Sequence, residues 1–238
     1  MIERAIIFGA SSGVGRATAA ALAQRGAKVW AVARSVASPL PGVTDVIGDA
    51  TDPAVVTRLL GEVDPDLAVV AVGIRPRVAP IDEYDWEAFS AVWNGDVRAA
   101  FHVGQLALRK PLRAGSHVVV VSSGAGLNGS PLSGGYAGSK RTQMFLADYL
   151  QKRSDARKLG IRYTAVVPNQ LLAGTDIAKA AAAGYAAVAG ITPEKFMERF
   201  EVPLDADGVA AAILRIADND APAGSILKLT GAKGLEPA

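Results

Sequence analysis

Short apolar runs alternate with longer helix-like segments along most of the chain. Apolar residues form nearly continuous runs at seven places: residues 5–8, 28–32, 43–47, 67–72, 117–121, 161–167 and 226–229. Continuous runs of this length are typical of strands that are covered on both faces, as in a parallel sheet. We therefore predict an α/β fold, a doubly wound parallel sheet of about seven strands with helices on both faces.

The chain has 238 residues, a length that suits a single domain. No repeat or low-complexity linker divides it, so we expect one domain over residues 1–238. Two segments interrupt the alternation of strands and helices. Residues 35–42 are typical of a loop, and residues 171–203 form a long irregular-to-helical insertion that we expect to be a lid over a binding site.

A glycine-rich run, Gly9-Ala-Ser-Ser-Gly-Val-Gly15, follows the first apolar run and precedes a helix-like segment, residues 16–25. Strand, turn and helix in this order are the context of a phosphate-binding loop, because glycines allow close backbone approach and the helix dipole attracts negative charge. A glycine-rich turn without a ligand is the alternative. The candidate binding residues here are Gly9, Ser11, Ser12, Gly13, Val14 and Gly15.

A tyrosine and a lysine four residues apart, Tyr136 and Lys140, follow Ser123 by thirteen residues or more. On a helix these two side chains share a face, so the ammonium can approach the phenol and favour phenolate. Ser123 at a strand end would donate a hydrogen bond to a carbonyl oxygen, whereas the neighbouring Ser122 would point to the other face of the strand. By itself, the Tyr-x-x-x-Lys pattern also fits a solvated surface pair.

Together and in this order, these motifs resemble the short-chain dehydrogenase/reductase family in its compact single-domain form. The family pattern Thr-Gly-x-x-x-Gly-x-Gly is matched over residues 8–15, with Phe8 in place of the threonine. The resemblance implies a Rossmann fold, a nicotinamide cofactor, and Ser123, Tyr136 and Lys140 as catalytic residues. It also implies hydride transfer between nicotinamide and the carbonyl or secondary alcohol of a small to medium apolar substrate.

The end of the second predicted strand bears on the choice of nicotinamide cofactor. An NAD-specific fold of this kind would place an acidic side chain there, but this chain has Ala33 followed by Arg34. A guanidinium matches a 2'-phosphate in bidentate geometry, and the missing carboxylate removes a repulsion. An exposed arginine without a ligand is the alternative. We predict NADP(H), with Ser11 as a second contact that the resemblance supports.

The resemblance implies further cofactor contacts at the ends of later strands. Asp49 matches an acid that accepts from the adenine amino group, although it could instead cap the helix near Pro53, for which Asp52 is better placed. Thr175 matches a threonine that binds the carboxamide, about two residues late, and could equally cap a helix. The family's Asn-Asn-Ala-Gly is Val-Ala-Val-Gly here. The remaining candidates are Ala50, Ala71, Gly73, Pro168 and Leu171, together with Tyr136 and Lys140.

Asp96 stands where the family has an asparagine that completes the catalytic set, although Asn94 lies close enough for the alignment to be ambiguous. An ionised Asp96 near Lys140 would offset part of the positive charge that favours phenolate. If this position acts only through its backbone carbonyl, an aspartate in place of the asparagine would hardly change the activity.

Composition disfavours several other classes of function. The net charge of +2 and the lack of a Lys/Arg run argue against nucleic-acid binding. The chain has no cysteine, and His102 and His117 are isolated, so we expect no thiolate chemistry and no metal site. Residues 178–189 fall short of the roughly 20 apolar residues that cross a bilayer, and the N-terminus enters its first strand too early for a signal peptide. We expect a cytoplasmic protein.

The substrate pocket is predicted from the loops that follow the strands and from the lid. Arg75 and Arg77 could receive an anionic group of the substrate, or could be solvated loop arginines. The other candidates are mostly apolar: Ile74, Gly124, Leu127, Asn128, Tyr185, Phe196 and Met197.

Residues 101–108 and 144–150 carry broad apolar surfaces in segments that pack against a partner subunit in the family. This implies a homodimer or homotetramer, unless the surfaces are buried within the monomer. Two other functions are open. A sensor or scaffold that binds NADP(H) without turnover fits the lost asparagine pair but has no need of Ser123. An epimerase or dehydratase would need a glycine pattern and a larger C-terminal domain that this chain lacks.

Overall fold

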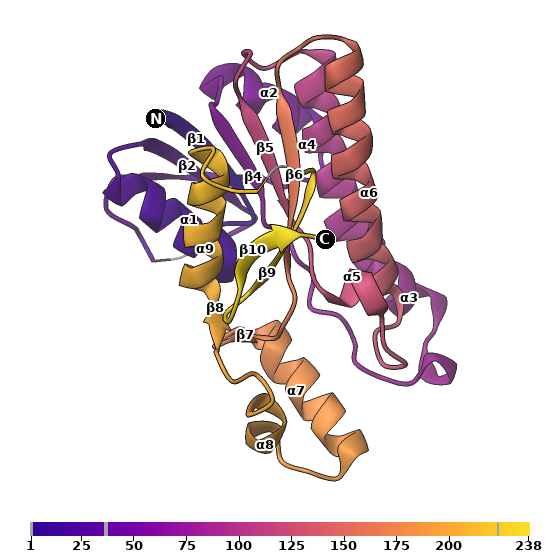
Figure 1. Ribbon diagram of the computed structural model, residues 1–238. Helices are drawn as coiled ribbons and strands as arrows, with labels where there is room; N and C mark the ends of the chain where they lie inside the picture. The colour runs from indigo at the N-terminus through magenta and orange to yellow at the C-terminus, as the bar shows by residue number, and fades with distance from the viewer. Residues whose placement is uncertain (1, 36–37, 223) are drawn as a thin grey trace.

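An eight-stranded sheet forms the centre of the computed structural model, which describes residues 2–35, 38–222 and 224–238 (Figure 1). The strand order is β10-β9-β6-β5-β4-β1-β2-β3, and within the described residues every neighbouring pair is parallel except β10 and β9. The strands are β1 (Arg4–Phe8), β2 (Lys28–Ala33), β3 (Val43–Ile47), β4 (Leu67–Val70), β5 (His117–Val121), β6 (Arg162–Pro168), β9 (Ile226–Thr230) and β10 (Gly234–Pro237).

This sheet confirms the predicted α/β fold with a doubly wound, mostly parallel sheet. Each of the seven apolar runs forms one of its strands, although β4 ends two residues before the run does. The apolar pattern does not predict the eighth strand, β10, because this short edge strand has the sequence Gly-Leu-Glu-Pro, with only one large apolar residue. Its proline can be accommodated because an edge strand leaves one row of backbone groups unpaired.

Helices cover both faces of the sheet, and successive residues of β1 enter the cores on opposite faces. Ala5 and Ile7 of β1 lie in the core under α1 and α9, whereas Ile6 and Phe8 lie in the core under α2 and α4. All four side chains are fully buried, which explains why the run is continuously apolar. The helices of the first face are α1 (Gly13–Gln24) and α9 (Ala206–Ala217), and those of the second are α2 (Pro53–Val63), α4 (Arg98–Arg109) and α6 (Gly135–Ala156).

The insertion predicted at residues 171–203 projects below the body of the molecule in Figure 1 and consists mainly of α7 (Asp176–Ala189) and α8 (Pro193–Met197). At its base, β7 (Leu172–Ala173) pairs in parallel with β8 (Leu204–Asp205), so the two ends of the insertion are held together. The other short elements are η1 (Ile81–Glu83), α3 (Trp86–Val92), the π-helical turn η2 (Trp93–Val97) and α5 (Ala125–Asn128). None of the described helices combines the length and apolar character that crossing a bilayer requires.

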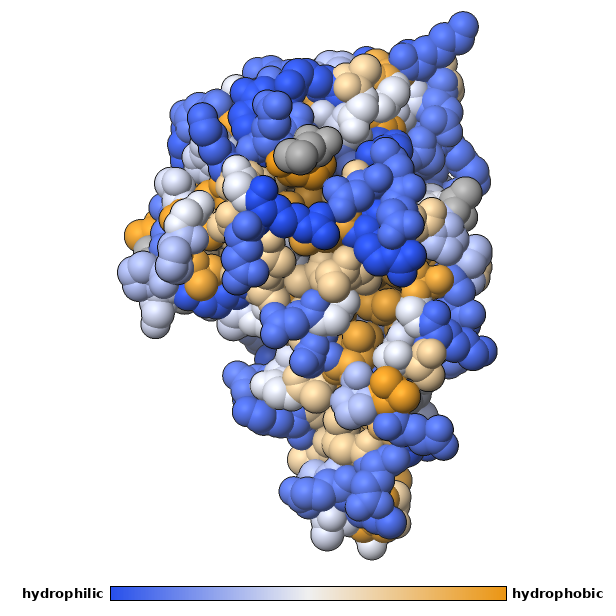
Figure 2. All heavy atoms as spheres, turned by 60° about the vertical axis from the view of Figure 1, so that its left-hand side comes forward, coloured by the Kyte–Doolittle hydropathy of each residue, from blue (hydrophilic) through white to orange (hydrophobic). Residues whose placement is uncertain are grey.

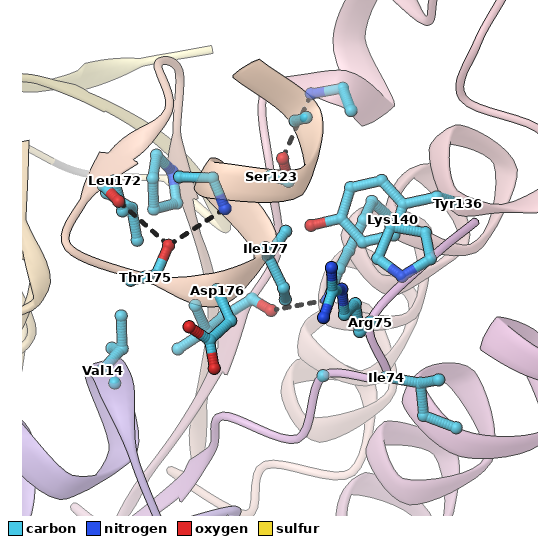
Figure 3. Close-up of a pocket in the computed structure, with 18 of the residues that line it drawn as sticks. Val14, Ile74, Arg75, Ser123, Tyr136, Lys140, Leu172, Thr175, Asp176 and Ile177 are labelled. Carbon is cyan, nitrogen blue, oxygen red and sulfur yellow. Dashed lines mark hydrogen bonds between the residues drawn. The ribbon is translucent and has the colours of Figure 1, made fainter. Parts of the chain in front are cut away.

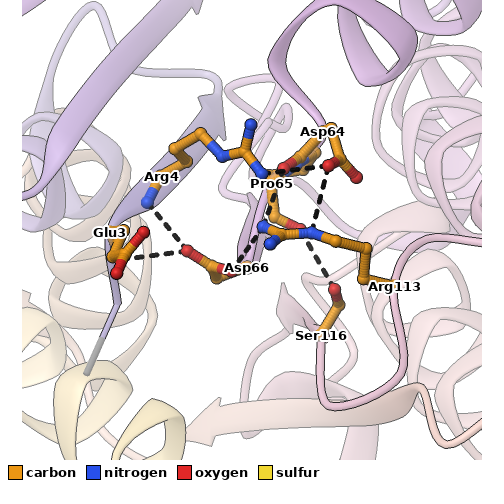
Figure 4. Close-up of polar contacts among 7 residues, drawn as sticks. All are labelled: Glu3, Arg4, Asp64, Pro65, Asp66, Arg113 and Ser116. Atoms are coloured by element: carbon orange, nitrogen blue, oxygen red, sulfur yellow. Dashed lines mark hydrogen bonds and ion pairs between the residues drawn. The ribbon is translucent and has the colours of Figure 1, made fainter.

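Charged side chains tie together the amino-terminal ends of the strands, at the sheet edge opposite the glycine-rich loop (Figure 4). Asp66, just before β4, accepts hydrogen bonds from the backbone amides of Glu3 and Arg4 at 2.9 Å and from the Arg113 guanidinium at 2.6 Å. Asp64, which ends α2 in the left-handed conformation, pairs with Arg4 at 2.9 Å and with Arg113 at 3.0 Å. These contacts fix β1, β4 and the loop before β5 relative to one another.

His117, the first residue of β5, is buried and bonds through Nε2 to the Thr164 hydroxyl at 2.9 Å on the adjacent strand β6. Burial, and then the nearby Arg162, lower the pKa of this imidazole from 6.5 to about 3. Among the described residues, no three His, Asp or Glu side chains converge as a metal site would require. His117 is therefore a neutral, hydrogen-bonded core residue.

We expect His117 to make the fold sensitive to acid. In the unfolded chain the His117 imidazole is protonated below about pH 6.5, whereas in the native protein it stays neutral down to about pH 3. Between these values protonation favours the unfolded state, so the free energy of unfolding falls as the pH falls. Between pH 7.5 and 5.0 this group alone should cost about 2 kcal/mol of unfolding free energy. Urea unfolding at the two pH values should show a smaller loss in His117→Gln than in the wild type. His102→Gln serves as the control, because burial and then Arg98 lower the pKa of this half-exposed imidazole less strongly than burial lowers that of His117. Equal losses in both variants would refute this assignment.

Candidate active site

A cleft of about 1280 Å³ opens at the carboxyl ends of the parallel strands, where doubly wound sheets bind their ligands (Figure 3). Its walls come from the loops after β1, β2, β3, β4, β5 and β6, from the start of α6 and from the lid. A typical small-molecule pocket has about 300–1000 Å³, so this cleft has room for a large ligand with a smaller one beside it. On the face turned forward in Figure 2, hydrophobic residues (tan and orange) form a band between hydrophilic margins (blue), and the band runs down towards the lower part of the molecule.

The glycine-rich loop forms one wall of the cleft, and its glycines are required by contacts with neighbouring backbone. Gly9 has a φ of 87°, and a Cβ there would lie 2.6 Å from the Val72 amide nitrogen. A Cβ on Gly15 would lie 2.3 Å from the Gly9 carbonyl oxygen. By contrast, a Cβ on Gly13 would meet no atom within 4 Å, so the room beside Gly13 belongs to the cleft. The N-cap Ser12 makes no side-chain cap bond, which leaves the first amides of α1 for an anion.

The predicted Ser, Tyr and Lys meet on the opposite wall. Tyr136 and Lys140 both lie on α6, with the Lys140 Nζ 5.5 Å from the centroid of the Tyr136 ring. Ser123 follows β5, lines the cleft and accepts a hydrogen bond from the Ala125 amide at 3.3 Å. Figure 3 shows the Tyr136 hydroxyl directed into the cleft towards the Ser123 side. Ser122 instead donates to the Lys140 carbonyl at 2.8 Å, so the two serines point apart as predicted.

Asp96 lies behind this wall in the π-helical turn η2, and its side chain has no exposure to solvent. Its Oδ2 is 2.8 Å from the Lys140 Nζ, and its Oδ1 accepts a hydrogen bond from the Ile74 amide at 2.8 Å. Its backbone carbonyl accepts from the Gln143 side chain at 3.1 Å. Asn94, the other possible counterpart of the family asparagine, is exposed at the cleft. Of the two, Asp96 is the one that contacts Lys140.

The Asp96 carboxylate determines the charge state of Lys140. Burial by itself lowers the pKa of Lys140, but the Asp96 carboxylate and, less strongly, Tyr136 raise it, and the result lies above the ordinary lysine value. Lys140 is therefore a buried ammonium at neutral pH. The stability that depends on its charge persists through neutral pH and is lost only as an alkaline pH rises through this raised pKa.

The loops after β2 and β3 carry the residues predicted for the adenosine end of a cofactor. Arg34 is exposed, lines the cleft, and has no carboxylate within 4 Å among the described residues. Asp49 and Ala50 line the cleft beside it. The hydrogen bond from the Thr51 amide, followed by the Thr51 hydroxyl and the charges of Arg34 and Arg98, outweighs burial and lowers the pKa of Asp49. Asp52, not Asp49, caps α2, through a 2.8 Å bond to the Ala54 amide.

The remaining predicted cofactor residues also lie at the cleft, with two qualifications. Thr175 caps α7 through the Ala178 amide at 3.2 Å and donates to the Leu172 carbonyl at 2.9 Å, so its hydroxyl is already engaged. Gly15 is buried behind the loop and does not line the cleft. The predicted residues that do line it are Gly9, Ser11, Ser12, Gly13, Val14, Arg34, Asp49, Ala50, Ala71, Gly73, Ser123, Tyr136, Lys140, Pro168, Leu171 and Thr175.

The insertion at residues 171–203 borders the cleft and makes contacts that sequence patterns do not reveal. The Tyr185 hydroxyl bonds the Ser130 hydroxyl, and the Tyr185 ring stacks on Phe196 with 5.5 Å between centroids. Ser130 was missed because its partner is 55 residues away in the sequence. Two predicted lining residues are wrong: Leu127 packs on the core near α6, and Met197 lies outside the cleft lining.

We expect Asp96→Asn to destabilise the fold, even though asparagine is the residue the family has here. An asparagine that accepts from the Ile74 amide must turn its NH2 group towards the Lys140 ammonium, which leaves a buried charge unpaired. Removing one partner of a buried pair costs about 3–5 kcal/mol. Urea unfolding at pH 7.5 measures this loss. Glu62→Gln, which breaks the solvent-exposed pair with Arg58 on α2, should change stability little, and similar effects of the two substitutions would contradict this account.

Comparison with known proteins agrees with this geometry. The model of the family described as short chain dehydrogenase matches residues 3–186. Carbonyl reductase [NADPH] 2 of Sus scrofa is 31% identical over 180 residues, which cover 71% of this chain and 72% of that protein. L-xylulose reductase of Mesocricetus auratus is 32% identical over 126 residues, or 50% of this chain, so the match spans about half (52%) of that reductase.

Solved structures show the same fold. The crystal structure of levodione reductase superposes with a TM-score of 0.81 and covers 97% of both chains at 22% identity. The family match spans more than half of the chain and contains the glycine-rich loop, Ser123, Tyr136 and Lys140. On these grounds the chain belongs to the short-chain dehydrogenase/reductase family.

Proposed function

We propose that this protein is an NADP(H)-dependent oxidoreductase that interconverts a carbonyl compound and the corresponding secondary alcohol. The observation that carries the proposal is the meeting of Ser123, Tyr136 and Lys140 on one wall of a cleft whose other wall is the glycine-rich loop. The room beside Gly13 and the uncapped start of α1 fit a diphosphate. The reductases named above support the reaction class, since this chain shares their family.

The catalytic wall can supply the proton that carbonyl reduction requires. NADPH, when bound, supplies the hydride to the carbonyl carbon. Tyr136 gives its hydroxyl proton to the carbonyl oxygen, so that an alcohol forms and a phenolate remains. Ser123 donates a hydrogen bond to the same oxygen and stabilises its developing negative charge. The Lys140 ammonium, 5.5 Å from the ring centroid, stabilises the phenolate.

Binding without turnover, as in a sensor, is less well supported by the architecture. A sensor fits the absence of the asparagine pair whose side chains brace the turn after β4 in the family. In this chain that turn has other supports. The Ala71 amide donates to the Phe8 carbonyl at 2.8 Å, and the Ile74 amide donates to Asp96 at 2.8 Å. The turn is therefore held in place without the asparagines.

The preference for NADP(H) rests on Arg34. Replacing Arg34 by Ala removes a charge-assisted contact to the 2'-phosphate, which should weaken NADPH binding by roughly 1 to 3 kcal/mol and leave NADH binding nearly unchanged. Dissociation constants for both cofactors, measured by fluorescence titration, test this. Arg58→Ala on the exposed side of α2 is the control. If Arg34→Ala weakened both cofactors equally, the assignment to the 2'-phosphate would be wrong.

The proposed reaction requires the Tyr136 hydroxyl. Tyr136→Phe keeps the ring and removes the proton donor, so turnover should be nearly lost while the dissociation constant for NADPH stays the same. A panel of ketones and alcohols, followed by NADPH absorbance, gives the readout. Tyr149→Phe makes the same chemical change at an exposed position of α6 and should be active. Substantial turnover by Tyr136→Phe would mean that another group carries the proton.

We also propose that the protein is a homodimer or homotetramer. Part of the apolar surface predicted for this role is used inside the monomer, because Met144 and Ala147 are fully buried. Phe101 on α4 and Phe145 and Tyr149 on α6 remain 40–59% exposed, and the last two rings stack on each other. Such an aromatic patch is typical of a subunit interface.

Light scattering at micromolar concentration should give the mass of a dimer or tetramer, because burying this patch favours association. Phe145→Glu, which places a charge in the patch, should shift the protein towards monomer. Val188→Glu is the control, since Val188 on α7 is also exposed (73%) but lies away from the patch. A monomeric mass for the wild type would refute the proposal.

A further inference from the structure

We propose that the substrate carries a carboxylate, which pairs with Arg75 beside the reacting carbonyl. The inference rests on the proposed oxidoreductase function and narrows its substrate class to oxo acids and hydroxy acids. Arg75 follows the turn after β4, lines the cleft and is exposed. Figure 3 draws the Arg75 side chain in the same part of the cleft as Tyr136 and Lys140.

The backbone that carries Arg75 is held by the catalytic wall itself. The preceding residue, Ile74, donates its amide to Asp96 Oδ1 at 2.8 Å. Its side chain packs so closely on Gly95 that a Cβ there would lie 2.2 Å from the Ile74 Cδ1. Asp96 in turn holds Lys140. The backbone at Arg75 is thus anchored to the residue that holds Lys140, unlike the backbone of an arginine at the tip of a free loop.

The charge of Arg75 is also uncompensated. Lys140 has the Asp96 carboxylate at 2.8 Å, and Arg77 has Glu83 at 3.8 Å with the Tyr84 ring under its guanidinium. For Arg75, no carboxylate of the described residues lies within 4 Å. A guanidinium in a cleft with no protein partner is suited to a bidentate carboxylate of the ligand.

The position of Arg75 favours the substrate over the cofactor as its partner. A diphosphate on the glycine-rich loop would lie near Val14, which Figure 3 shows across the cleft from Arg75. The lining on the lid side includes the apolar Ile177 and the stacked rings of Tyr185 and Phe196. Charged side chains also line it: Asp176, Arg77, and Arg199, whose guanidinium lies 4.7 Å from the centroid of the Phe196 ring. This combination fits a substrate with an apolar body and one anionic end.

The test compares matched acids and esters in wild type, Arg75→Gln and Arg77→Gln. The acids are 4-oxopentanoate, 5-oxohexanoate and 6-oxoheptanoate, which vary the spacing between carbonyl and carboxylate, and each is paired with its methyl ester. We expect kcat/KM for at least one acid to exceed that of its ester, and this preference to fall by roughly 10- to 100-fold in Arg75→Gln, the loss expected for a charged hydrogen bond. Arg77→Gln should keep the preference, and all three proteins should bind NADPH alike.

Two outcomes separate this inference from the proposed function. If the ketones turn over but every acid and ester react equally, or Arg75→Gln affects both alike, the inference is wrong and the oxidoreductase function stands. If nothing turns over, calorimetric titration of the same keto acids into the NADPH complex decides. Binding that Arg75→Gln weakens by at least tenfold supports the carboxylate site without catalysis, whereas no binding, or binding that is equal in both proteins, refutes it.

Discussion

The ion pair between Asp96 and Lys140 joins three segments at the wall of the cleft that carries Tyr136 and Lys140. Lys140 belongs to α6, Asp96 to the π-helical turn before α4, and the Ile74 amide that Asp96 also binds belongs to the turn after β4. Both charged groups are buried, so each depends on the other: an unpaired ammonium or carboxylate at this depth would be strongly unfavourable. The π-helical turn has a clear consequence here, because it directs the Asp96 carboxylate inward and leaves Asn94 at the cleft.

The amino-terminal and carboxyl-terminal ends of the parallel strands have different roles in this fold. At the amino-terminal edge, Asp64 and Asp66 bind backbone amides and arginines and so align β1, β4 and β5. At the carboxyl edge the same strands end in the glycine-rich loop, the turn with Ile74, and Ser123. Residues more than a hundred positions apart in the sequence therefore meet in one cleft with a backbone that is fixed from the other end.

Positive charge is distributed unevenly around the cleft. The Asp96 carboxylate neutralises the charge of Lys140. The electrostatic effect of this ammonium is therefore limited to the Tyr136 phenol and to ligand groups in contact with it. Three arginines that line the cleft, Arg34, Arg75 and Arg199, have no carboxylate within 4 Å among the described residues. Guanidinium groups on several loops around one cleft suit a pair of ligands that each carry an anionic group.

The sequence by itself determined the strands, the glycine-rich loop, and the set of Ser123, Tyr136 and Lys140. These features depend on local periodicity and on residues such as Gly9, whose positive φ and tight contacts exclude a side chain. Only the tertiary structure decided which of Asp96 and Asn94 contacts Lys140, and which of Arg75 and Arg77 has a carboxylate partner. It also decided that Tyr185 of the insertion bonds Ser130, and that β10 pairs with β9 as an edge strand. The side-chain contacts among these depend on segments that only packing brings together. The strand β10 depends on its pairing with β9, since its composition does not favour a strand.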